Sequence, residues 1–140
     1  MKHLTSDRCR LHAIRLLPGQ DLKEELQKLT THARVHAGFI LSAAGSLTKA
    51  ALRMANRNES TVLDGPFEII SLTGTLAHDG IHVHMAVSDG EGNTTGGHLM
   101  EGNVVFTTVE LVIGEAVGLL FRREMDERTG FKELVIQRAG

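Results

Sequence analysis

Three histidines in the middle of the chain have the types and spacing of a metal site. His82 and His84 are separated by one residue, and His98 follows the pair Gly96-Gly97 after a glycine-rich stretch. Side chains at positions i and i+2 of a strand project to the same side, roughly 6–7 Å apart along the backbone. Three imidazoles that converge on one Zn²⁺ leave its fourth position open, which is the arrangement of catalytic zinc sites. We expect His82, His84 and His98 to bind zinc or another divalent metal.

An open metal position could activate a water molecule or polarise a carbonyl group. Chemistry of this kind needs charged neighbours, and the stretch Lys49 to Arg57 offers cations along one face of a predicted strand. We interpret Lys49 as a solvated residue that protects a sheet edge. Arg53 and Arg57 can be interpreted in two ways. Either they belong to the same solvated face as Lys49, or one of them holds an anion beside the metal.

A β-hairpin is predicted to position His82 and His84. Asp79-Gly80 is a strong signal for a two-residue type I′ turn, which would place Thr75 opposite His84 and Ala77 opposite His82. The two histidines then share one face, and we expect Thr75 to contact the His84 imidazole. The other face is apolar, and its residues are Leu72, Gly74, Leu76, Ile81, Val83, Met85 and Val87. This apolar face predicts which side meets the core. A loop is expected to return His98 to the same site.

The other histidines are interpreted as non-ligands. A helix is predicted to begin at Asp21, with Glu24 three residues later as in a capping box, and its buried stripe is Leu22, Leu26, Leu29 and Ala33. His32 and His36 would lie four residues apart near its C-terminus, where imidazoles interact favourably with the helix dipole. Nothing in the positions of His3, His12 and His78 indicates that they bind a metal.

The remaining chain reads as strands and turns. Strands are predicted over residues 10–17, 38–44, 49–57, 61–63, 67–76, 104–113, 117–123 and 131–137. On the first of these, Leu11, Ala13 and Leu17 are expected to face inward. Gly45-Ser46 and Asp64-Gly65-Pro66 are expected to interrupt the strands, and a second short helix is expected near 45–51 or after Gly97. The prediction is an α+β fold, a mainly antiparallel twisted sheet with one or two packed helices, in a single domain over residues 1–140.

Composition disfavours several function classes. The net charge of −2 gives no general attraction to nucleic acid or anionic membranes, and the chain has no Trp or Tyr for base stacking. No stretch has the apolar length of a membrane span. The single cysteine, Cys9, is expected to be a half-buried apolar residue and fits a reducing compartment. We therefore expect a cytoplasmic protein.

Two stretches resemble a known family. The segment Gly65 to Thr75, GPFEIISLTGT, followed by a hairpin and Gly96-Gly97-His98, is similar to the PPC domain, the plant and prokaryote conserved domain of unknown function. Upstream, Gly38-Phe39-Ile40 and Gly45-Ser46-Leu47 fit as well. The resemblance implies a homotrimer. Plant members follow an AT-hook, which gave prokaryotic members a predicted DNA-binding label; this chain lacks that Arg-Gly-Arg-Pro element. Some prokaryotic members with matching histidines are associated with zinc.

A more distant resemblance concerns the site alone. The His82-x-His84 pattern with a third histidine is similar to the metal site of acetolactate decarboxylases, which implies a nearby arginine and carboxylate. Arg53 is the candidate arginine, and Glu68, Glu101 and Glu110 are the candidate carboxylates. Three roles stay open: a metal-binding PPC-type protein with a small-molecule or regulatory role, a metal-dependent enzyme acting on a small carbonyl or hydroxy acid, and a trimeric protein-partner or DNA-associated module.

Overall fold

The structure, a computed structural model, describes residues 1–140 and contains eight strands and one helix. In chain order the elements are β1 (Cys9–Leu16), α1 (Leu22–His32), β2 (Gly38–Arg53), β3 (Ser60–Ala77), β4 (Gly80–Ser88), β5 (Thr94–Leu99), β6 (Val104–Ala116), β7 (Leu119–Asp126) and β8 (Phe131–Arg138). Every strand pair is antiparallel. The predicted sheet is confirmed, and it is accompanied by one helix rather than two.

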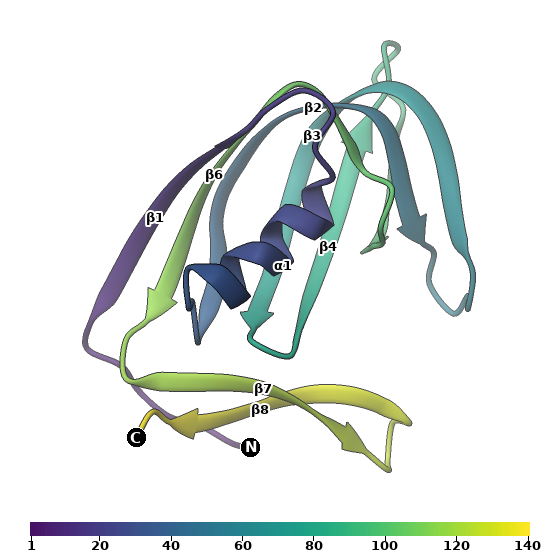
Figure 1. The fold of residues 1–140 in the computed structure, drawn as a ribbon. Helices are drawn as coiled ribbons and strands as arrows, with labels where there is room; N and C mark the ends of the chain where they lie inside the picture. The colour runs from purple at the N-terminus through teal and green to yellow at the C-terminus, as the bar shows by residue number, and fades with distance from the viewer.

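Six strands form one large sheet in the order β1-β6-β2-β3-β4-β5, while β7 and β8 pair with each other as a separate hairpin. β5 also pairs with the end of β2, through Leu52 with Leu99 and Arg53 with His98. This extra pairing closes β2, β3, β4 and β5 on one another. Figure 1 shows the large sheet curving around α1, with the β7–β8 hairpin lying across its lower end.

Local sequence signals determine where α1 begins and ends. Asp21 is the N-cap, and its carboxylate accepts a hydrogen bond from the Glu24 backbone N–H at 3.0 Å, as predicted. The helix ends at His32, so His36 lies beyond it. The expectation that both histidines share this helix is therefore wrong. With 11 residues and a polar outer face, α1 lacks the length and apolar character needed to cross a membrane.

The main core lies between α1 and the inner face of the large sheet. Most of the apolar hairpin residues that were predicted to face inward, namely Leu72, Leu76, Val83, Met85 and Val87, are buried in it together with Leu22 and Leu26 of the helix, and Ile81 packs against it partly buried. A second, smaller cluster consists of Ala37, Ala77, Leu119 and Phe121. It packs β7 against the large sheet and so fixes the β7–β8 hairpin in place.

Strand β1 turns the opposite face inward from the one predicted. Leu11 is 64% exposed, whereas Ile14 packs against the core and Leu16 is buried. Apolar residues occur at both alternating positions, so the sequence pattern is ambiguous here. Pairing with β6 decides the orientation because Ile14 and Leu16 lie opposite buried β6 residues. Cys9 at the start of the strand is exposed rather than half-buried.

The two long strands β2 and β3 run through the breaks that the sequence predicted. Residues 38–53 form one strand, and register shifts near Ile40 and between Gly45 and Lys49 replace the expected interruption or helix. Such bulges bend a strand without ending it. Asp64-Gly65-Pro66 likewise lies within β3. Leu41, expected in a buried strand, is 53% exposed.

The β3–β4 hairpin turns at His78 and Asp79 rather than at Asp79 and Gly80. Thr75 therefore lies opposite His82 instead of His84. Because the pairing differs from the prediction by two residues, every side chain keeps its predicted face. The Asp79 carboxylate accepts a hydrogen bond from the Arg123 backbone N–H at 3.0 Å. Asp79 thus contacts a strand that is distant in the sequence, and the residues of the turn give no indication of this contact.

Candidate metal centre

Strand β4 carries His82 and His84 on the side of the sheet that faces away from the main core. Val83 and Met85, which alternate with them, are 1% and 2% exposed. Both histidines are exposed. The apolar residues thus determine the orientation of the strand, and the two imidazoles project together on the other face, as predicted.

His98 comes from strand β5, where the sequence predicted a loop. It lies directly opposite His84 in the β4–β5 pair and opposite Arg53 in the β2–β5 pair. Gly97 permits the second pairing, because a Cβ atom at this position would lie 2.7 Å from the Arg53 carbonyl oxygen. The absence of a side chain at Gly97 therefore brings His98 beside both His84 and Arg53.

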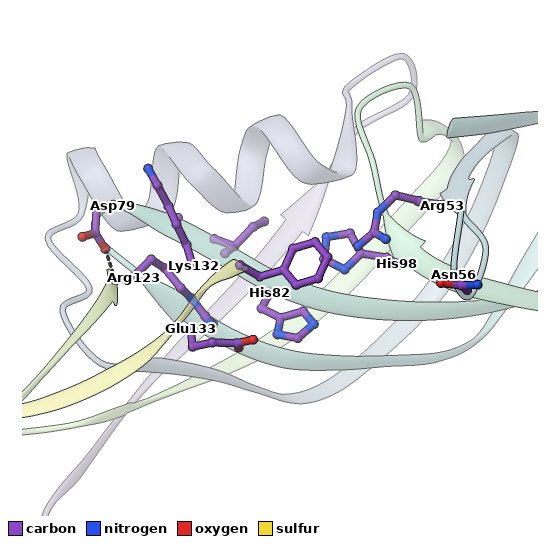
Figure 2. Close-up of a pocket in the computed structure, with 11 residues that line it drawn as sticks. Arg53, Asn56, Asp79, His82, His98, Arg123, Lys132 and Glu133 are labelled. Carbon is purple, nitrogen blue, oxygen red and sulfur yellow. Dashed lines mark hydrogen bonds between the residues drawn. The ribbon is translucent and has the colours of Figure 1, made fainter. Parts of the chain in front are cut away.

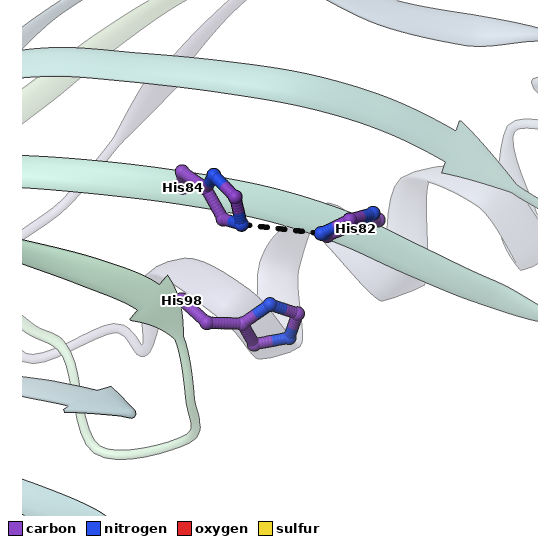
Figure 3. A group of neighbouring side chains, drawn as sticks. All are labelled: His82, His84 and His98. Carbon is purple, nitrogen blue, oxygen red and sulfur yellow. Dashed lines mark hydrogen bonds between the residues drawn. The ribbon is translucent and has the colours of Figure 1, made fainter. Parts of the chain in front are cut away.

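The three imidazoles form a compact group, which Figure 3 shows with the rings turned toward a shared space. The ring centroids are 4.9 Å apart for His82 and His84, 5.1 Å for His82 and His98, and 5.7 Å for His84 and His98. One nitrogen of each ring lies within 4.8 Å of the other two, and the Nε2 atoms of His82 and His84 are 3.1 Å apart. Zn–N bonds of about 2.0–2.1 Å separate two tetrahedral ligands by roughly 3.4 Å. The donor set therefore fits one divalent ion after small side-chain rotations.

The surroundings favour the neutral imidazoles that bind metals. Burial lowers the pKa of His98 to about 4, and the positive charge of Arg53 is the next cause. Partial desolvation also lowers the pKa of His82, followed by the charges of Arg123 and His84. Both shifts favour the neutral form of the ring, which is the form that coordinates an ion.

His82 and His98 line a pocket of about 580 Å³, a size typical of small-molecule sites. Arg53 and Asn56 lie at one end, and Arg123 and Glu133 lie at the other, with the histidines between them (Figure 2). The hairpin β7–β8 therefore completes a pocket whose floor is the large sheet.

Only part of the predicted charged surroundings lies at the site. Arg53 lines the pocket, and its Nη1 donates to the Arg57 carbonyl oxygen at 3.1 Å. Glu68, Glu101 and Glu110 are exposed and line no part of it; their strands and loop direct them elsewhere on the surface. Their candidacy as the nearby carboxylate is not supported.

Two charged residues at the pocket that sequence reasoning missed are Arg123, its second arginine, and Glu133, which lines the pocket in addition to Asp79. Both come from the β7–β8 hairpin, and neither forms part of a recognisable motif. The only local signal was the basic pair Arg122-Arg123 at a strand end. Thr75, expected beside His84, instead accepts a hydrogen bond from the Arg123 Nη2 through its Oγ1. Thr75 therefore holds Arg123 in place.

Comparison with known proteins gives a family match and close structural neighbours. The model of the Plants and Prokaryotes Conserved (PCC) domain matches residues 4–117. A Synechococcus protein (strain JA-3-3Ab) named bifunctional protein GlmU is 45% identical over 129 residues, which are 92% of this chain. The chain spans only 21% of the length of that relative.

Two solved structures are similar over nearly their whole length. A hypothetical protein from Salmonella enterica is 44% identical with a TM-score of 0.93, and the match covers 98% of this chain and 99% of that one. A metal-containing protein from Archaeoglobus fulgidus is 26% identical with a TM-score of 0.83, and the match covers 96% and 99% of the two chains. The fold of this chain is thus similar to both structures over nearly its whole length.

Proposed function

This chain belongs to the Plants and Prokaryotes Conserved domain family, and we propose that it binds one divalent metal ion, zinc or another, through His82, His84 and His98. The convergence of three imidazole nitrogens within 4.8 Å of one another carries this proposal. The name of the similar Archaeoglobus fulgidus protein, a metal-containing protein, supports it. The three histidines would hold the metal, which would supply a Lewis acid beside the pocket that His82 and His98 line.

Metal analysis tests this proposal. Protein purified without chelator should contain about one equivalent of zinc or another transition metal per chain, and the variant His82→Ala/His84→Ala should contain almost none. Loss of two of three ligands removes most of the coordination energy, so retention in the double variant would contradict the assignment. His32→Ala is the matched control, since this exposed histidine at the end of α1 lies outside the imidazole group.

A metal-dependent enzyme acting on a small carbonyl or hydroxy acid is the second candidate. The pocket favours it, because His82 and His98 of the imidazole group line one cavity with Arg53, Arg123 and Glu133. A carboxylate can move a proton and an arginine can hold an anionic group while the metal polarises an oxygen. Turnover of hydroxy acids or carbonyl compounds by the metal-loaded protein, and its loss in Glu133→Gln, would establish this role.

Self-association as a homotrimer is part of the proposal. The large sheet exposes apolar side chains on β1, β2, β3 and β6, namely Leu11, Leu41, Val62, Ile70 and Phe106. Large exposed apolar residues in numbers mark interaction surfaces.

A DNA-associated role is the remaining alternative; the net charge of −2 gives it no electrostatic support. It predicts binding that weakens steeply with salt. We place the protein in the cytoplasm, since Cys9 has no disulfide partner.

A further inference from the structure

The pocket beside the imidazole group has an uneven distribution of charge. At one end Arg53 is accompanied by the uncharged Asn56, whereas the other end combines Arg123 and Lys132 with Asp79 and Glu133 (Figure 2). The first end is therefore purely cationic, and the second carries both signs. A ligand that fits this pocket should place its negative group at the Arg53 end.

The two arginines of the pocket lack ion-pair partners. Neither Arg53 nor Arg123 forms a salt bridge with a carboxylate. Arg53 uses one donor for the Arg57 carbonyl oxygen, which positions the guanidinium and leaves its other N–H groups available. A partly buried cation without a counter-charge favours binding of an anion. Arg53 also pairs directly with His98 across β2 and β5, so an anion bound there lies next to the metal ligands.

The chemistry of the pocket favours a carboxylate over a phosphate. Phosphate sites are commonly formed by helix N-termini or by runs of backbone N–H groups. The pocket lining includes no helix residue, and Asp21 occupies the N-terminus of α1 with its own carboxylate. The guanidinium fork can bind a carboxylate through two parallel N–H···O bonds without such backbone donors. At the opposite end Asp79 and Glu133 offset the charges of Arg123 and Lys132, so a second negative group meets no net attraction there.

We propose that the pocket binds a small monocarboxylic acid with a hydroxyl or carbonyl oxygen on the adjacent carbon. This inference rests on the proposed metal site and names the ligand class of that site. Arg53 binds the carboxylate, the adjacent oxygen takes the open position at the metal, and the rest of the acid extends toward the β7–β8 hairpin. Because Glu133 and Asp79 offset Arg123 and Lys132, a second carboxylate gains little at that end, which favours monocarboxylic over dicarboxylic acids.

Cobalt(II)-loaded protein tests the inference, because the visible absorption of cobalt reports exchange of its ligands. Glycolate should change the spectrum of the wild-type protein, whereas ethylene glycol, which lacks the carboxylate, should not. Arg53→Gln should weaken glycolate binding about tenfold or more, as expected for a lost charge-assisted hydrogen bond, and should keep one cobalt per chain. Arg53→Lys should retain part of the affinity. Arg122→Gln is the matched control: Arg122 is an exposed neighbour on β7 outside the pocket.

The outcomes distinguish failure of the proposed ligand class from failure of the proposed metal site. Failure to take up cobalt would overturn both. Stoichiometric cobalt with equal glycolate binding by wild type and Arg53→Gln, or tighter binding of inorganic phosphate than of glycolate, would overturn the ligand class alone. Selectivity has its own readout: Glu133→Gln should improve binding of malate relative to lactate, and an unchanged ratio would contradict the role given to Glu133.

Discussion

His98 takes up a proton at an unusually low pH for a histidine. Partial burial on β5, between β4 and the end of β2, and the charge of Arg53 lower its pKa from the usual 6.5 to about 4. In the unfolded chain the same side chain is solvated and titrates near its usual value. Between these two pH values the unfolded state binds a proton that the folded state does not.

We expect the metal-free protein to lose stability as the pH falls from about 6.5 to about 4. Stability rises with pH wherever the unfolded state binds more protons, so the contribution of His98 is fully present above 6.5 and is lost below it. Urea unfolding of chelator-treated protein across this range measures the effect, and His98→Gln should flatten the dependence. The metal-free protein is expected to fold, because the apolar side of β4 is buried without the metal. A profile that is identical in the variant would contradict the assignment.

At the residue scale, the sequence identified the imidazoles but only part of their surroundings. Period-two alternation separates buried Val83 and Met85 from His82 and His84, so a local pattern carries that information. Arg123 and Glu133 reach the site through packing of Leu119 and Phe121 against Ala37 and Ala77. No pattern in the hairpin sequence indicates this packing, which is why Arg123 and Glu133 were missed.

At the scale of elements, β5 is the strand on which the site depends most. It pairs with β4 through His84–His98 and with β2 through Arg53–His98. The sequence predicted a polar loop from Ser88 to Thr95 that returns His98 to the site, because this segment is rich in glycine and polar residues. Two-sided backbone pairing outweighs the poor strand propensity of the segment. Long-range pairing likewise carries β2 and β3 through their predicted breaks.

Gly97→Ala should both destabilise the protein and weaken metal binding. The new Cβ would lie 2.7 Å from the Arg53 carbonyl oxygen, so β5 must move away from β2. Overpacking of this kind costs roughly 1–3 kcal/mol. Chemical denaturation and zinc titration measure the two effects. Gly90→Ala is the control, since a Cβ there meets no atom within 4 Å; equal losses in both variants would show that the β2–β5 contact is not responsible.

At the scale of the whole molecule, the exposed apolar residues of the large sheet are its most prominent surface feature. Phe106 is 48% exposed and Ile70 is 59% exposed, although both belong to strands whose other face is buried in the main core. Burial of apolar area is the dominant drive for association. A trimer would remove these side chains from water.

Phe106→Glu should dissociate the proposed trimer. Light scattering coupled to size exclusion should give about three times the 15.2 kDa mass of one chain for the wild-type protein and a lower mass for the variant. A buried, unpaired carboxylate at an interface is strongly unfavourable. Met125→Glu is the control, because Met125 is 62% exposed on the hairpin rather than on the large sheet. A monomeric wild-type protein would refute the trimer outright.

The separate pairing of β7 with β8 has an evolutionary consequence. The hairpin follows residue 117, where the family match ends, and it shares no sheet register with the six other strands. Insertions or substitutions in it leave the pairing that sets the three histidines unchanged. The part of the pocket that the hairpin lines can therefore vary among descendants of one ancestor while the arrangement of the three imidazoles is inherited intact.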